Sequence, residues 1–125
     1  MLTNKEEIIS LFHSLLLTIM SQRRQSLAKQ AFREQQLQRW GHRSCISGST
    51  EDLTVRAFWP DIPLNDWNCV VVTKKENMSI AHSKNWSKIY PDEVVDFMEG
   101  HRRVDELVRR ELEEFERQQR VDRIQ

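Results

Sequence analysis

The chain has 125 residues, and its 19 Lys and Arg side chains balance its 19 Asp and Glu side chains. This length predicts one domain, large enough to bury a core without disulfides or a structural metal. The neutral balance argues against a protein that binds a polyanion through its overall charge, although it allows local charged patches. Cys45 and Cys69 are the only cysteines, too few for a disulfide framework, and they indicate a reducing, cytoplasmic compartment.

A long N-terminal helix is predicted for residues 4–40. Thr3 and Glu6 have the spacing of a capping box, in which each side chain bonds to the other residue's backbone N–H. This motif predicts that the helix starts near Asn4. Gly41 is the residue type that adopts the left-handed conformation past a helix end, so it predicts where the helix stops.

Apolar side chains recur along this helix at steps of three and four residues. The run Ile8–Met20 is strongly apolar, but it is too short to span a bilayer and lacks the flanks of a signal peptide. We therefore interpret it as core and expect no membrane contact. Arg23 lies in the middle of the stripe, where an unpaired charge is costly to bury, so we expect a break near Ser21, an acidic partner, or the edge of the core. The stripe comprises Ile9, Phe12, Leu16, Met20, Leu27 and Ala31.

Three antiparallel strands are predicted between residues 53 and 82. Apolar and polar residues alternate in Leu53–Trp59 and in Trp67–Thr73, which is the period of a strand. Two prolines lie between these segments and lack a backbone donor, so residues 60–66 are predicted to form a wide loop. A third short strand is predicted at Met78–His82, after a polar turn.

A second long amphipathic helix is predicted for residues 91–120, and we expect residues 121–125 to fray. Acidic residues follow Pro91 in its first turn, as the positive end of a helix favours. Gly100 weakens the helix, but the stripe keeps its phase across it, which favours one continuous helix. Four acid-before-base pairs at a spacing of four residues, beginning with Asp105 and Arg109, stabilise its outer part. The stripe comprises Val94, Phe97, Met98, Val104, Val108, Leu112 and Phe115.

Together these elements predict a single α+β domain that spans residues 1–125. In this arrangement the N-terminal and C-terminal helices cover one face of a small three-stranded antiparallel sheet. The C-terminal helix, from Val94 to Phe115, is expected to pack against the rest of the protein.

Residues that bind metals or catalyse reactions are present, but their spacing matches no known site. The ligand types of a structural zinc site are supplied by His42, Cys45, Cys69 and His82. There is no Cys-x2-Cys pair, and a thiol among valines is ordinary core. Cys45 with His82 or His101, supported by Asp92, could act as a nucleophile, but no glycine pattern or phosphate-binding loop accompanies them. We predict no catalytic residue, no metal and no cofactor.

A basic segment, residues 21–43, has a net charge of +5, because it contains six basic residues and only one acidic residue, Glu34. The predicted order of helix, three strands and helix is also that of double-stranded-RNA-binding domains, but the final helix here begins with Asp92 and Glu93, where such a module needs positive charge. The basic residues also scatter around the helix axis instead of forming one face that could follow a phosphate backbone. Nucleic-acid binding is therefore the alternative function and not the main one. They are Arg23, Arg24, Lys29, Arg33, Arg39 and Arg43.

Large apolar side chains gather on and around the proline-containing loop. Tryptophan is common at the energetic centre of protein interfaces, so this loop is predicted to bind a partner; the alternative is that its side chains cap the sheet. The predicted contact residues are Trp59, Ile62, Leu64 and Trp67, together with Arg23, Arg24, Lys29, Arg33 and Arg39. The predicted function is that of a non-enzymatic interaction module, a homodimer that acts as regulator, adaptor or inhibitor of a larger protein or nucleoprotein.

Overall fold

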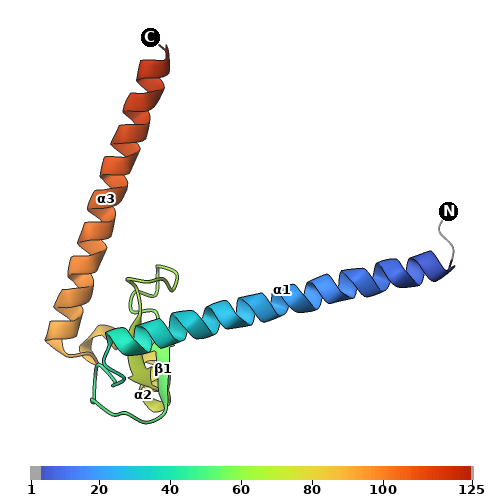
Figure 1. Cartoon of the computed structure of the whole chain (residues 1–125). Coiled ribbons are helices and arrows are strands. Elements are labelled where there is room, and N and C mark those ends of the chain that lie inside the picture. The colour runs from blue at the N-terminus through green and yellow to red at the C-terminus, as the bar shows by residue number, and fades with distance from the viewer. Residues whose placement is uncertain (1–3, 125) are drawn as a thin grey trace. The chain divides into compact units, whose positions relative to one another are not determined.

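The computed structural model describes residues 4–124 and has an α+β fold with a long helix at each end (Figure 1). The elements are α1 (Asn4–Arg39), β1 (Leu53–Arg56), β2 (Val70–Thr73), α2 (Lys74–Ala81), the 3-10 helix η1 (Trp86–Lys88) and α3 (Asp92–Ile124). The chain divides into two compact units between Gln35 and Gln36, inside α1.

Helix α1 runs without a break from Asn4 to Arg39, so the break near Ser21, one of the three alternatives considered for Arg23, does not occur. The predicted Thr3 cap lies outside the described residues. At the other end Gly41 adopts a left-handed φ of 70°, as predicted. The N–H of His42 reaches back to the carbonyl of Leu37 at 2.8 Å, which closes the helix end.

The first unit consists of the helical residues up to Gln35, and its apolar side chains are exposed. The interpretation of Ile8–Met20 as core is therefore wrong. A single helix has no second element within its own unit to cover its side chains. Large apolar side chains that are 46–71% exposed are Ile8, Ile9, Leu11, Phe12, Leu15, Leu16, Leu17, Ile19, Met20 and Leu27.

Within the second unit the sheet has two antiparallel strands, in which Leu53 lies opposite Thr73 and Arg56 opposite Val70. The side chains of Val70, Val71 and Val72 are fully buried, so both faces of β2 are covered. A run of valines is the pattern of a strand buried on both faces. The predicted strand positions 57–59 and 67–69 lie outside the ladder.

The predicted third strand at Met78–His82 is wrong, because these residues lie in and just after α2, which packs on both strands. Thr73 caps this helix: its hydroxyl accepts the N–H of Glu76 at 3.1 Å, and the Glu76 carboxylate accepts the N–H of Thr73 at 2.8 Å. The buried Ser44 hydroxyl also donates to that carboxylate at 2.6 Å. Burial alone would raise the pKa of Glu76, but these hydrogen bonds outweigh it and lower the pKa.

The core lies between the sheet, α2, η1 and the start of α3. It consists of Phe58, Val70, Val72, Ile80, Tyr90 and Met98, and the half-buried Trp40, Trp59 and Trp86 pack against it. The Phe58 ring is 1% exposed and lies 4.9–5.1 Å from the rings of three other aromatic residues. We call residues 36–102, which hold this core, the body.

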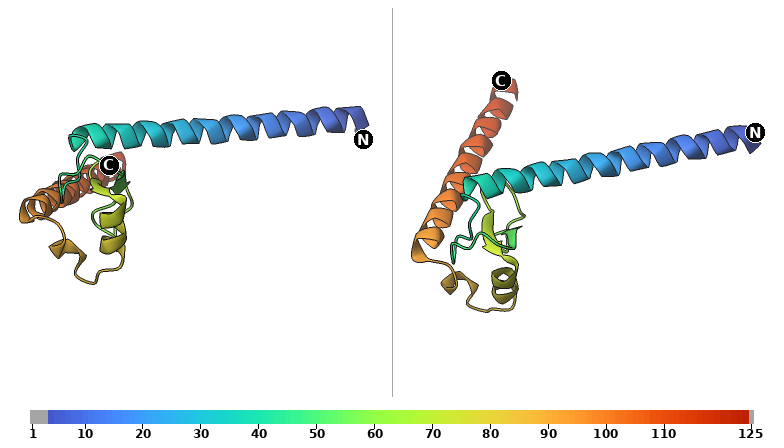
Figure 2. Two further views of the ribbon diagram at one scale, coloured as in Figure 1. Left: turned by 90° about the horizontal axis from the view of Figure 1, so that it is seen from below. Right: turned by 60° about the horizontal axis from the view of Figure 1, so that its bottom comes forward.

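Helix α3 is continuous across Gly100, as predicted, but it continues to Ile124, so the predicted fraying from residue 121 is wrong. Only its first turns belong to the core, through Met98 and the half-buried Val94. The expectation that the helix packs against the rest of the protein as far as Phe115 is therefore wrong, because the apolar side chains from Val104 to Phe115 are exposed. Beyond the body the helix extends away, as Figure 1 and the right view of Figure 2 show. The predicted pair of Asp105 and Arg109 is present at 2.9 Å, while Arg117 pairs with Glu114.

Candidate partner-binding surfaces

Asn68 holds the tryptophan loop, residues 59–67, in place within the body. Its side chain is fully buried. The side-chain oxygen accepts the N–H of Trp59 at 2.8 Å, and the side-chain nitrogen donates to the carbonyls of Trp59 at 3.1 Å, Ile62 at 2.9 Å and Pro63 at 3.3 Å. Asn68 could not be singled out from its sequence context, because it occupies a polar position in an alternating strand pattern.

Trp59 lies inside this arrangement and is half-buried. Its indole N–H donates to the carbonyl of Met98 at 3.3 Å, and its ring packs edge-on against Trp86. The Arg102 guanidinium lies 4.8 Å from the ring centre and forms an ion pair with Asp61 at 2.8 Å. The Trp59 side chain therefore ties the loop to α3, which leaves only part of its surface for a partner.

The other predicted loop residues differ in their exposure. Ile62 and Trp67 are half-buried, and Leu64 is 46% exposed. Trp40, outside the loop, packs against Phe97 and donates its indole N–H to the carbonyl of Cys69 at 3.1 Å. Among the four predicted contact residues of the loop, Leu64 is thus the one whose side chain is exposed.

The second surface is the α1 apolar segment, residues 8–20. At 1.5 Å per residue it is about 20 Å long, and at 100° per residue its large apolar side chains cover about two-thirds of the helix circumference. These side chains are all exposed in the described chain. A patch of this kind usually marks a place where a protein binds another molecule.

The basic segment begins directly after it. Arg23, Arg24, Lys29 and Arg33 are exposed on α1. Arg39 is exposed too, but its guanidinium donates to the backbone carbonyl of Asp66, which ties it to the tryptophan loop. On a helix the first four side chains point in several directions, so they form no continuous basic face.

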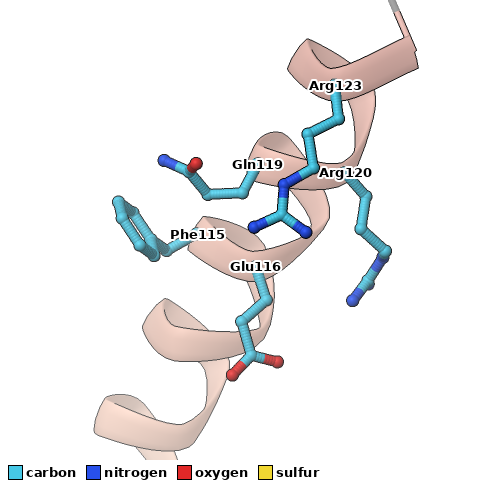
Figure 3. A pocket seen from close by; sticks show the side chains of 5 residues that line it. All are labelled: Phe115, Glu116, Gln119, Arg120 and Arg123. Atoms are coloured by element: carbon cyan, nitrogen blue, oxygen red, sulfur yellow. The ribbon is translucent and has the colours of Figure 1, made fainter.

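A third surface is the α3 stripe, which we define as Phe97, His101, Val104, Val108, Leu112, Phe115 and Gln119. Its apolar members are 51–62% exposed. The ring of His101 packs edge-on against Phe97 at 4.4 Å. Near the outer end of α3, Phe115 and Gln119 point to the same side of the helix beside a surface hollow (Figure 3).

Of the residues considered for metal binding and catalysis, Cys45 is half-buried and Cys69 is buried. Burial is the main reason why the pKa of Cys45 rises to about 12 and that of Cys69 to about 11. Both thiols are therefore protonated at neutral pH, which is unfavourable for a nucleophile. Among residues 4–124, no three His, Cys, Asp or Glu side chains come together where they could hold a metal ion.

Helix length and hydropathy give one further finding. In the part of the chain that the structure describes, none of the helices has a segment long and apolar enough to cross a membrane.

Comparisons with protein-family models, with curated proteins and with solved structures find no match to this chain.

Proposed function

We propose that this chain is a non-enzymatic interaction module that binds a larger protein through the α1 apolar segment. The observation that carries the proposal is the exposure of the large apolar side chains of residues 8–20 on a helix. Burying one such side chain contributes about 1.5–3 kcal/mol. Several of them can therefore outweigh the cost of association and give micromolar or tighter binding.

The chemistry of the segment indicates how the partner would hold it. Ile9, Phe12 and Leu16 follow one another at steps of three and four residues, the spacing by which an amphipathic helix anchors in an apolar groove. Such a helix occupies a surface of its partner and performs no reaction there. This mode of binding fits a regulator, adaptor or inhibitor, and we propose that it acts in the cytoplasm.

The proposal moves the contact from the tryptophan loop to α1. Trp59 and Trp67 are half-buried, and the Trp59 indole N–H and ring are engaged within the body. The loop then contributes at most through Leu64. The basic segment, next to the apolar segment, can add pairs with acidic residues at the rim of the partner's groove.

Affinity capture from an extract of the native host tests the proposal. Leu16→Asp places a charge among the apolar side chains, so we expect the amount of captured partner to fall at least about tenfold. Ser14→Asp is the matched control, because it makes the same charge change on the opposite side of the helix, and Leu64→Asp tests the loop. Equal capture by Leu16→Asp and the wild type would refute the proposal, and loss with Leu64→Asp alone would return the contact to the loop.

Nucleic-acid binding through the basic segment is the second candidate, favoured by the exposure of Arg23, Arg24, Lys29 and Arg33. Four phosphate contacts would lower the affinity about 100-fold when the salt concentration rises fourfold from 50 mM. We expect no retarded band in a mobility-shift titration at low salt, because these side chains form no single face. A band with that salt dependence, weakened by Arg23→Gln and Arg24→Gln, would establish the alternative.

A further inference from the structure

The α3 stripe has a spacing that is symmetric about Val108. Its residues follow one another at steps of 4, 3, 4, 4, 3 and 4, which repeats every 11 residues and reads the same in both directions. An 11-residue period is 3.67 residues per turn, close to that of a straight α-helix, so the stripe stays on one side throughout. A stripe of this kind can face a second copy of itself that runs in the opposite direction.

We propose that the α3 stripe pairs with the α3 stripe of a second copy of this chain in an antiparallel helix pair centred on Val108. In this register Val108 faces Val108 of the second copy, and Val104 faces Leu112 of the second copy. Farther out, His101 faces Phe115 and Phe97 faces Gln119. This pairing goes beyond the proposed function, since it uses another surface and another partner.

Surface hollows lie at both ends of the stripe. One is lined by Asp96, Phe97, Gly100, His101 and Val104, and the other by Phe115, Glu116, Gln119, Arg120 and Arg123 (Figure 3). In the antiparallel register Phe115 of one copy lies opposite the hollow beside Gly100 of the other. Gly100 has open space where a Cβ would be, so it leaves room for this ring. Large side chains that enter hollows of the facing helix are the usual mode of helix packing.

Charges along one flank of the stripe favour the antiparallel direction. Asp105 and Arg109 lie close to the centre, so Asp105 of each copy comes near Arg109 of the other and extends the ion pair seen within one chain at 2.9 Å. Glu116 lies at the height of His101 of the second copy, where its carboxylate can accept a hydrogen bond from the imidazole N–H. A parallel pair would instead place His101 beside its own counterpart and away from Glu116 of the other copy.

The same charges limit the length of the contact. Glu93 and Asp122 lie just beyond the two ends of the stripe, and in the antiparallel register Glu93 of one copy comes near Asp122 of the other. Like charges at this distance repel. The pair is therefore confined to the turns between Phe97 and Gln119, most of which lie beyond the body.

The mass of the full-length chain in solution tests the dimer. Sedimentation equilibrium of the wild type should give twice the 15.0 kDa of one chain. Val108→Glu places two like charges at the centre of the interface and should weaken dimerisation at least about 100-fold. Arg110→Gln changes the net charge equally on the opposite side of α3 and should leave the dimer intact. A monomeric wild type, or a Val108→Glu protein that stays dimeric, would overturn the proposal.

Disulfide crosslinking tests the direction, in a background where Cys45→Ser and Cys69→Ala remove the native thiols. Two Val104→Cys side chains would lie about 12 Å apart along the axis of an antiparallel pair, too far for a disulfide. An equal mixture of Val104→Cys and Leu112→Cys should therefore crosslink, while each protein alone should not. Crosslinking of Val104→Cys alone would show a parallel pair. The monomeric Val108→Glu protein should still capture the partner of α1, because the two surfaces are different. Failure of the dimer proposal can therefore be distinguished from failure of the proposed function.

Discussion

Replacing Phe58 with Ala is expected to destabilise the body by about 3–5 kcal/mol, since the side chain is lost from a close-packed site and leaves a cavity. The Phe58 ring is 1% exposed and lies 4.9 Å from the rings of both Trp59 and Tyr90. The ring of Phe58 meets Trp59 edge-to-face and Tyr90 at a tilt, and aromatic pairs of this kind add about 0.5–1.5 kcal/mol beyond burial. For a small domain this is a large part of the total stability of about 5–15 kcal/mol.

Urea unfolding followed by tryptophan fluorescence measures this loss, because Trp40, Trp59 and Trp86 pack against the core that unfolds. Phe12→Ala is the matched control: it removes the same side chain from a position on α1 that is 68% exposed, and it should change the free energy of unfolding by less than about 0.5 kcal/mol. If Phe58→Ala and Phe12→Ala had equal effects, the assigned core would be wrong.

The Asn68→Ala variant is expected to lose about 2–4 kcal/mol, since buried polar groups without a partner cost about 1–3 kcal/mol each. The substitution removes the acceptor for the Trp59 N–H and the donor to the Ile62 carbonyl. It therefore leaves at least two backbone groups of the tryptophan loop unpaired. The loop should then open locally, even where the remaining body stays folded.

Limited proteolysis within residues 60–67, together with urea unfolding, measures the effect of Asn68→Ala. Cleavage in this loop should become at least several-fold faster than in the wild type. Asn85→Ala is the control, because the side chain of this exposed residue caps no helix end. Unchanged cleavage and stability in Asn68→Ala would show that the loop does not depend on this amide.

The long helices and the strand positions could be predicted because each depends on local patterns. Apolar periodicity located α1 and α3, and alternation located Leu53–Arg56 and Val70–Thr73. Helix α2 was missed, although Thr73 and Glu76 have the same capping-box spacing that was recognised at the N-terminus. The apolar residues after Glu76 are too few to distinguish a helix from a strand by period alone.

Burial was harder to predict than secondary structure, because it depends on which elements meet in space. The stripe of α1 reads as core in the sequence, yet its side chains are exposed. The tryptophans suggested a binding loop, but the indole N–H of Trp59 donates a hydrogen bond to the backbone carbonyl of Met98. These two residues are far apart in the sequence, so the contact could not be predicted from it. The same limitation hid Asn68, whose partners lie five to nine residues away within a loop.

Photo-crosslinking from α1 tests the central claim most directly. A photoreactive phenylalanine analogue replaces Leu16 in one protein and Leu64 in another, and both are irradiated in an extract of the native host. The account predicts one discrete adduct with a larger protein from position 16 and none from position 64. No adduct from position 16, an adduct from position 64 alone, or a position-16 product at twice the 15.0 kDa of one chain would contradict it.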